Sequence, residues 1–244
     1  MFIDNSRLGN IHKLPMKNLH SWNLSYSKAR ECQEALASKV RFISLKRPPK
    51  LIAGIDCAFS KDGGKIIAAA VVLKLPAFDL IETVSAVRKV TFPYIPGLLS
   101  FREAPVCIAA VEKLKCKPDL FMIDGQGIAH PRRLGLAAHL GLFFDRPTIG
   151  CAKSRLTGIY EEPGLEKGAH ALLKDKKGML SGQSDTIGAV VRTRTNVKPV
   201  FVSVGNKCVL KDAIEIILAC AVKYRLPEPT RLAHQFVSKL KLEI

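Results

Sequence analysis

The sequence has no apolar run long enough to cross a membrane. Its longest apolar stretch, Ile66–Leu75, is interrupted by Lys74 and stopped by Pro76, whereas a membrane span needs roughly 18–20 apolar residues. The first ten residues, MFIDNSRLGN, lack the apolar core of a signal peptide. We therefore expect a cytoplasmic protein with no membrane contact.

Paired cysteine motifs are also missing. The seven cysteines are an odd number without CxxC spacing, and Cys57, Cys107 and Cys220 lie in apolar strings, so we expect buried thiols in a reducing compartment rather than disulfides or a zinc site. There is no GxxxxGK[ST] loop for a nucleotide and no HExxH for zinc. The glycines at 125 and 127 lack the third glycine of a dinucleotide-binding turn.

Acidic residues are scarce, and the balance of charge is strongly basic. Only 21 Asp and Glu oppose 38 Lys and Arg, which leaves a net charge of +17. Such a surplus indicates an anionic partner, usually nucleic acid, although it can also serve solubility alone. Hydrophobic residues make up 48% of the chain, which excludes a disordered polycation.

Apolar periodicity and turn residues predict the elements of the fold. Strands are expected at 51–59, 65–75, 79–90, 120–123, 148–152, 187–192 and 199–204, and helices at 27–40, from 97 to 117, at 134–143, 211–224 and 230–242. On the first helix, Ala29, Cys32, Ala35, Leu36 and Val40 share the apolar face. Residues 160–185 are charged and glycine-rich, and we expect a surface excursion there.

This order of elements predicts an α/β fold with a mixed sheet flanked by helices. The first three strands have hairpin spacing, which indicates an antiparallel meander. The basic helical segment 1–50 is expected to pack on the same domain as residues 51–244, so that the chain forms a single domain overall.

Three acidic residues lie where a bound cation would explain them. Asp56 interrupts an apolar strand, Asp124 follows the buried strand 120–123, and Glu103 lies near the start of a helix. Asp56 could instead pair with an arginine, Asp124 could cap a turn, and Glu103 could complement a helix dipole. Taken together, converging carboxylates suit Mg²⁺, and such a site in a basic protein is typical of phosphodiester cleavage.

Six longer strings closely resemble the endonuclease V family. They are GID at 54–56, PYIPGLLSFRE at 93–103, DGQGIAHPR at 124–132, PTIGCAKSRL at 147–156, KPVFVSVG at 198–205 and YRLPEPTRLAH at 224–234. The resemblance spans roughly residues 20–240.

The resemblance implies a ribonuclease H-like fold and a metal-dependent DNA repair endonuclease, using Mg²⁺ with Mn²⁺ as a substitute. Such an enzyme recognises deaminated bases, chiefly deoxyinosine, and hydrolyses the second phosphodiester bond 3′ to the lesion. Asp56, Glu103 and Asp124 would hold the metal, Lys153 would stabilise the phosphate, and His234 would lie near the metal. By residue type alone, Lys153 would be a solvated lysine, and His234 would be a surface or packing histidine.

The resemblance also assigns Tyr94 to a wedge at the lesion. The two prolines of Pro93-Tyr94-Ile95-Pro96 stiffen the loop, and a rigid apolar wedge can enter a base stack. The tyrosine could alternatively pack on the core. Main-chain groups at Gly97, Leu99 and Gly125, with help from His130, are expected to bind the base.

Three residues depart from the family pattern. Gln126 and Asn206 stand where histidine is common, and Cys151 stands where valine is common. None of these changes removes an expected metal ligand, but Gln126 leaves the range of accepted lesions open.

Two other functions remain open from the sequence. One is a different ribonuclease H-like nuclease, acting on inosine-containing RNA or branched DNA. The other is a non-catalytic nucleic-acid-binding protein, although a pure binder gains nothing from carboxylates facing phosphate. A monomer that binds nucleic acid is expected in either case.

Overall fold

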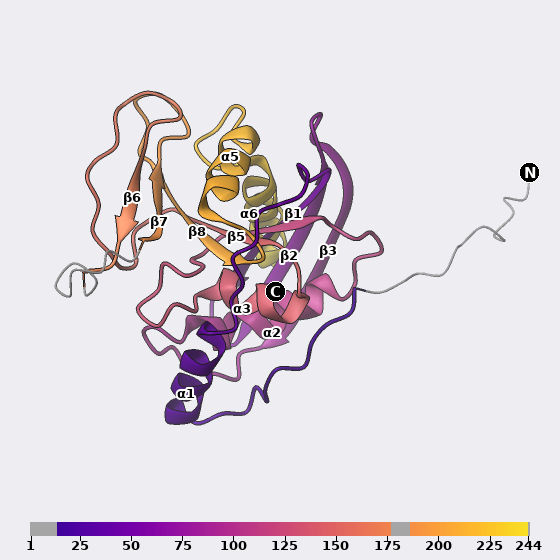
Figure 1. The fold of residues 1–244 in the computed structure, drawn as a ribbon. Helices are drawn as coiled ribbons and strands as arrows, with labels where there is room; N and C mark the ends of the chain where they lie inside the picture. The colour runs from indigo at the N-terminus through magenta and orange to yellow at the C-terminus, as the bar shows by residue number, and fades with distance from the viewer. Residues whose placement is uncertain (1–13, 177–185, 244) are drawn as a thin grey trace, which may run out of the picture.

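The computed structural model describes residues 14–176 and 186–243, in which one mixed sheet is flanked by helices on both faces (Figure 1). The strands are β1 (Leu51–Phe59), β2 (Lys65–Lys74), β3 (Asp79–Lys89), β4 (Leu120–Ile123), β5 (Thr148–Ala152), β6 (His170–Lys174), β7 (Thr186–Val191) and β8 (Val200–Asn206). The helices are α1 (Tyr26–Ala37), α2 (Leu99–Val111), α3 (Leu136–Phe144), α5 (Leu210–Cys220) and α6 (Glu228–Leu240), followed by a 3-10 turn, η2 (Lys241–Glu243). None of the described helices is both long and apolar enough to cross a lipid bilayer.

The eight strands run in the order β3-β2-β1-β4-β5-β8-β7-β6. The first three form the predicted antiparallel meander, and the β1–β2 hairpin turns at Gly63, whose φ of +71° favours glycine. Strands β1, β4 and β5 are parallel to one another, while β8, β7 and β6 continue the sheet antiparallel. The predicted α/β class with a mixed sheet is confirmed.

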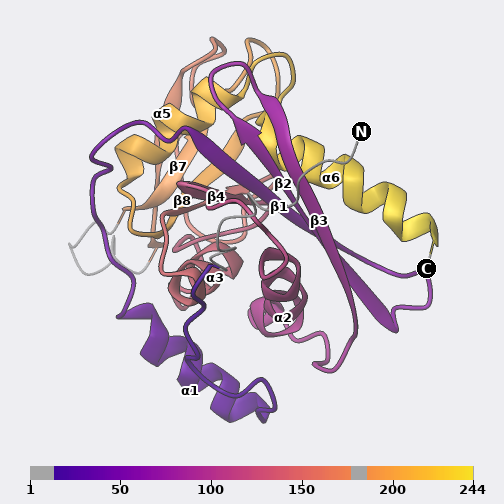
Figure 2. The same cartoon turned by 90° about the vertical axis from the view of Figure 1, so that its right-hand side faces the viewer.

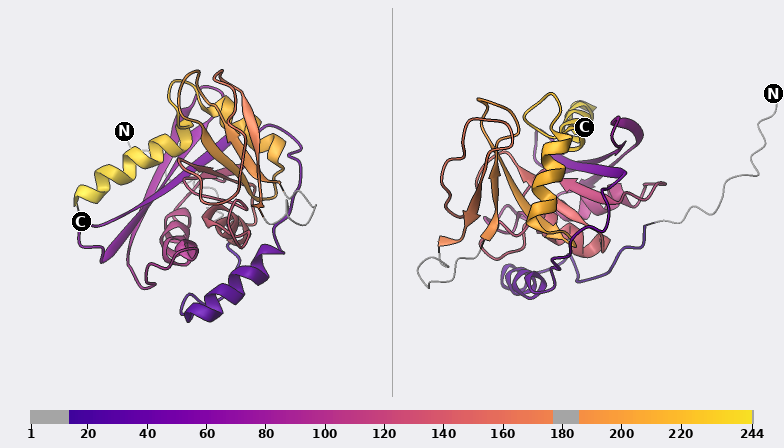
Figure 3. Two further views of the ribbon diagram at one scale, coloured as in Figure 1. Left: turned by 90° about the vertical axis from the view of Figure 1, so that its left-hand side faces the viewer. Right: turned by 45° about the horizontal axis from the view of Figure 1, so that its top comes forward.

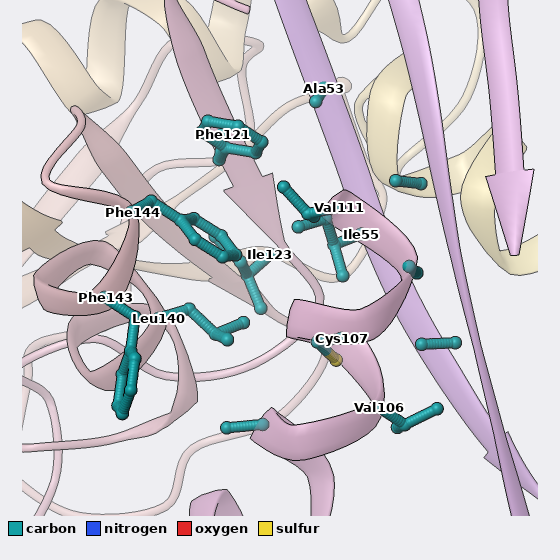
Figure 4. Packing of buried hydrophobic residues seen from close by; sticks show 14 of the residues in the cluster. Ala53, Ile55, Val106, Cys107, Val111, Phe121, Ile123, Leu140, Phe143 and Phe144 are labelled. Atoms are coloured by element: carbon teal, nitrogen blue, oxygen red, sulfur yellow. The ribbon is translucent and has the colours of Figure 1, made fainter. Parts of the chain in front are cut away.

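Helices α2 and α3 cover one face of the sheet, and α5 and α6 cover the other (Figures 2 and 3). Side chains alternate along β1, so Ile55 packs toward α2 and α3 while Ile52 packs toward α5. Figure 4 shows the first of these clusters, to which Ile55 of β1, Ile123 of β4 and Cys107 of α2 all belong. Helix α1 lies outside α2 and α3 and packs on both through apolar contacts.

Some predicted elements were wrong in extent. Helix α1 ends at Ala37 rather than residue 40, α2 at Val111 rather than 117, and α5 at Cys220 rather than 224. Helix α3 begins at Leu136, so Pro131 lies before its first turn.

One strand was missed altogether. The excursion predicted at 160–185 contains β6, a short edge strand paired with β7; residues 177–185 lie outside the described residues, as do residues 1–13 of the basic N-terminal segment.

A buried histidine makes the fold sensitive to acid. His139 is completely buried beside Trp22 and Phe143, and its ring nitrogens bond to Ser100 Oγ (3.1 Å) and His20 Nε2 (2.8 Å). Burial, reinforced by His20, lowers the pKa of His139 from 6.5 to about 3. Between these values only the unfolded chain takes up the proton, so this group's contribution to stability is lost as the pH falls below 6.5.

We expect His139→Gln to remove this component of the pH dependence. The variant has a lower free energy of unfolding than the wild type at pH 7. The difference between the two free energies narrows by about 1.4 kcal/mol for each pH unit below 6.5, because only the wild type loses the contribution of His139. Urea unfolding of both proteins at pH 7 and pH 5 measures the gap. A gap that stays constant would show that His139 does not take up its proton on unfolding.

Candidate active site

Two carboxylates lie side by side where strand β4 ends beside the middle of strand β1. Ile55 of β1 is in register with Ile123, the last residue of β4, so Asp56 within β1 lies beside Asp124, which follows β4. The Asp124 backbone N–H donates to the Ile55 carbonyl at 2.9 Å, which fixes this alignment past the end of β4. The sheet itself therefore brings together two acids that are 68 positions apart.

Helix α6 places a histidine over the first of these acids. His234 Nδ1 lies 2.7 Å from Asp56 Oδ2. The approach depends on Gly54, because a Cβ there would lie 1.9 Å from the Pro229 carbonyl oxygen at the start of α6. Gly54 and Asp56 point to the same face of β1, and glycine at the first position lets the helix reach the second.

Asp124 pairs with the lysine that follows β5. Lys153 Nζ lies 2.5 Å from Asp124 Oδ2. The alternative for Asp124 is therefore wrong, because this carboxylate does not serve merely as a turn cap. Lys153 is a surface lysine, as its alternative held, but its ammonium is paired with Asp124. Asp56 likewise bonds to His234 and to the Cys57 N–H, not to an arginine.

These side chains fit a divalent cation. Ligand atoms of Asp56, Asp124 and His234 all lie within 4.8 Å of one another. Carboxylate oxygens are the ligands that Mg²⁺ and Mn²⁺ prefer, and imidazole is an acceptable third donor for a transition metal. Burial, and then the charge of Asp124, raises the pKa of Asp56, so the ionised carboxylates gain most from a cation between them.

Glu103 belongs to the same electrostatic group without being among the three closest ligands. It lies one turn into α2, past the first turn where it would complement the helix dipole. Burial raises its pKa to about 7, the charges of Asp56 and Asp124 add to this effect, and a hydrogen bond with the Cys57 thiol opposes it. Its carboxyl therefore shares the negative field of Asp56 and Asp124.

The acids open into a cavity of about 440 Å³, a size suited to a small ligand or a single base. Twenty residues line the cavity. Eleven of them are singled out by the sequence, either as site residues or, for Gln126, as a departure from the family pattern. They are Asp56, Tyr94, Ile95, Pro96, Gly97, Leu99, Glu103, Asp124, Gly125, Gln126 and His130. Pro93, Lys153 and His234 are not lining residues. Ser154, Arg155 and Leu156 are lining residues that the sequence reasoning did not single out, although they lie inside one of the quoted strings.

Tyr94 is at the open side of this cavity. Its side chain is 67% exposed, so the alternative that it packs on the core is wrong. The ring is therefore free to contact a ligand at the cavity.

His130 is part of the cavity wall. It is buried, and burial together with the charges of Arg132 and Arg133 lowers its pKa to about 4. The neutral ring accepts the Arg132 N–H at Nδ1 (3.1 Å) and hydrogen-bonds the Gly97 backbone through its other nitrogen. This histidine therefore ties two wall segments together.

The three departures from the family pattern have different surroundings. Gln126 lines the cavity and donates from Nε2 to the Ser154 carbonyl at 3.0 Å. Asn206 instead accepts the Arg41 N–H and donates to the Gly141 carbonyl, away from the cavity. Cys151 is a buried strand residue. Only Gln126 is in a position to affect what the cavity accepts.

Comparison with known proteins gives a consistent result. The sequence model of a family described as Endonuclease V matches residues 34–235. Endonuclease V of Methanothrix thermoacetophila is 50% identical over 216 residues, which are 88% of this chain and 92% of that protein. The crystal structure of Endonuclease V from Streptomyces avermitilis is 41% identical, with a TM-score of 0.85 over 91% of this chain and 96% of that one.

One similar structure contains nucleic acid. Ciona intestinalis Endonuclease V, in complex with a 23mer DNA containing an inosine followed by a ribo-adenosine, is 28% identical. Its TM-score is 0.74, and the match covers 89% of this chain and 97% of that chain.

Proposed function

The chain belongs to the endonuclease V family, and from this premise we propose that it is a metal-dependent DNA repair endonuclease acting on deoxyinosine and other deaminated bases. The ribonuclease H-like fold expected from the resemblance is confirmed by the solved relatives. The observation that carries the proposal is the acidic group formed by Asp56 within β1 and Asp124 after β4, which opens into a base-sized cavity beside the exposed Tyr94.

We assign the metal to Asp56 and Asp124, with Glu103 and His234 beside them, and propose Mg²⁺ with Mn²⁺ as a substitute. When bound, the cation supplies Lewis-acid stabilisation of the phosphate and a lowered pKa for water. The ligand atoms of Asp56, Asp124 and His234, all within 4.8 Å of one another, support this assignment, because a divalent cation can take the place of the proton that His234 Nδ1 and Asp56 Oδ2 share at 2.7 Å.

Lys153 is the proposed cationic partner of the phosphate. Its ammonium is held by Asp124 at the edge of the acidic group and is 39% exposed, so an approaching phosphate can contact it without a rearrangement of the strands. As a compact point charge it favours the extra negative charge that develops on the phosphate during hydrolysis.

The lesion is proposed to enter the cavity while Tyr94 takes its place in the stack. Pro93 and Pro96 stiffen the loop that carries the ring, and Ile95 lies between the ring and Pro96 on the same loop. Hypoxanthine differs from adenine by an O6 acceptor and an N1–H donor, and main-chain groups at Gly97, Leu99 and Gly125 are the proposed readers of that edge. Cleavage then falls at the second phosphodiester bond 3′ to the lesion.

The remaining properties of the working protein are also proposals. We propose a monomer with one domain, since acids and cavity come from a single chain and α1 packs on α2 and α3. A cytoplasmic location agrees with the cysteines, all seven of which are free thiols.

An end-labelled duplex with one deoxyinosine tests the proposed function. We expect a single nick one nucleotide beyond the lesion with Mg²⁺, and none on the matched deoxyadenosine duplex. An RNA strand with one inosine is tested in parallel. The ratio of the nicking rates on the DNA and the RNA shows which nucleic acid this protein prefers. Equal nicking of the inosine and adenine duplexes would contradict the proposal.

A further inference from the structure

A buried glutamine outside the sheet is bonded to two walls of the cavity. Gln33 lies on α1 and is 0% exposed. It was not part of the apolar face predicted for this helix, which included Ala35 instead. In the structure Ala35 is exposed, and the buried face of α1 consists of Ala29, Gln33 and Leu36.

The amide group of Gln33 has a partner for each of its polar atoms. Nε2 donates to the Gly97 carbonyl at 3.0 Å and to the Leu134 carbonyl at 2.7 Å. Oε1 accepts from Arg132 Nε at 2.5 Å. Because both carbonyls require a donor, the orientation of the amide is fixed by its surroundings.

The two carbonyls belong to different walls. Gly97 closes the loop that carries Tyr94, whereas Leu134 ends the segment that follows Asp124, and both residues line the cavity. Their positions in the chain differ by 37 residues, and neither residue belongs to a strand of the sheet. The Gln33 amide is thus a direct hydrogen-bonded bridge between them.

Arg132 strengthens the bridge at Gly97. Its Nη2 donates to the Gly97 carbonyl at 2.7 Å, so that carbonyl receives donors from both Gln33 and Arg132. Arg132 also packs directly against the backbone of the loop, because a Cβ at Gly97 would lie only 2.7 Å from Arg132 Nη2. The φ of +79° at Gly97 likewise favours glycine at this position. This wall of the cavity is therefore fixed from behind by side chains that do not touch the acids.

We propose that Gln33 is a positioning residue for lesion recognition: it holds the Gly97 and Leu134 walls at the separation that admits the deaminated base. The inference rests on the proposed function of the cavity. It gives the N-terminal helix α1 a role in selectivity although the helix contributes no residue to the cavity lining.

The proposal separates recognition from chemistry. Removing the amide takes the donor from the buried Leu134 carbonyl and one of two donors from the Gly97 carbonyl. The walls are then free to shift, while Asp56, Asp124 and His234 keep their own contacts. A misplacement on the order of 1 Å can cost up to about 100-fold in a positioned reaction. Selectivity and KM should therefore change more than metal affinity.

The test uses Gln33→Met, which keeps the length of the side chain, and Gln33→Glu, which keeps the acceptor for Arg132 but loses both donations. We expect the preference for binding an inosine duplex over an adenine duplex, measured by fluorescence anisotropy in chelator, to fall at least about tenfold in both. KM for inosine-dependent nicking rises, and Mn²⁺ affinity, measured by calorimetry, stays at the wild-type value.

Thr148→Val is the matched control. Thr148 is fully buried and donates to the Ala137 carbonyl at 3.0 Å, so the control also loses one buried hydrogen bond, but Thr148 does not line the cavity. We expect it to lower the melting temperature while keeping the inosine preference. Should Gln33→Met fail to fold, Gln33→Glu and Arg132→Lys, which disrupts the same bridge, decide the question.

The outcomes are distinguishable. An inosine preference that survives in the Gln33 and Arg132 variants overturns the positioning role, and so does an equal loss in Thr148→Val, since that would mark a general effect of destabilisation. A wild-type protein with no inosine preference would instead contradict the proposed function.

Discussion

Replacement of Asp124 by asparagine is expected to abolish strand cleavage while leaving lesion binding in place. The change removes the carboxylate that lies beside Asp56 and is the ionic partner of Lys153, yet keeps the size of the side chain. A divalent cation is worth several kcal/mol to a developing charge, and each 1.36 kcal/mol is tenfold in rate. We therefore expect the nicking rate to fall by at least about 10³-fold.

Single-turnover nicking of the deoxyinosine duplex measures this effect, with anisotropy as the parallel measure of binding. Asp79→Asn is the control, because Asp79 is an exposed acid at the start of the edge strand β3 and carries the same change of charge. Wild-type rates in Asp124→Asn with Mg²⁺ present would remove Asp124 from the metal site, and lost binding would mean that it acts on recognition instead.

Tyr94→Ala is expected to lose lesion discrimination and to keep metal binding. The ring is exposed at the mouth of the cavity and has no core packing to lose, so the fold should be little affected. Opening a base step costs a few kcal/mol, which an inserted side chain offsets. We expect the ratio of inosine to adenine binding to fall on the order of 10–100-fold, and Tyr94→Phe to retain it because the ring remains.

The control for this experiment is Tyr26→Ala. Tyr26 is another exposed tyrosine, 53% accessible, at the start of α1. The Tyr26→Ala variant should leave the ratio of inosine to adenine binding unchanged. A ratio preserved in Tyr94→Ala, with Mn²⁺ affinity also preserved, would refute the wedge.

The strands at the centre of the sheet could be predicted from the sequence because each is a continuous apolar run bounded by turn residues. Strands β1, β4 and β5 have the predicted limits. Strand β6 was missed because it is short, lies at the edge of the sheet and is largely exposed, so that its pattern resembles a surface loop.

The acids of the site could be predicted for a similar reason. A carboxylate such as Asp56 within an apolar strand has a high cost of burial, and this cost makes it a candidate ligand on the amino-acid pattern alone. His234 has no such local signal; only the family resemblance pointed to it, since its position over Asp56 depends on how α6 packs on β1 at Gly54.

The burial of Gln33 on α1 could not be predicted from the sequence. A search for apolar periodicity passes over a glutamine, and the partners that make its burial favourable lie 64, 99 and 101 positions away. Such a side chain is buried because three groups from other segments satisfy its amide, and these contacts exist only in the folded chain.

The most direct test of the account separates binding from cleavage by means of the cation. The wild-type protein is mixed with the deoxyinosine duplex in chelator, anisotropy and nicking are recorded, and Mg²⁺ is then added to the same sample. The account predicts inosine-selective binding without nicking in chelator, followed by nicking at the second bond 3′ to the lesion once Mg²⁺ is present. Nicking that proceeds unchanged in chelator would contradict it.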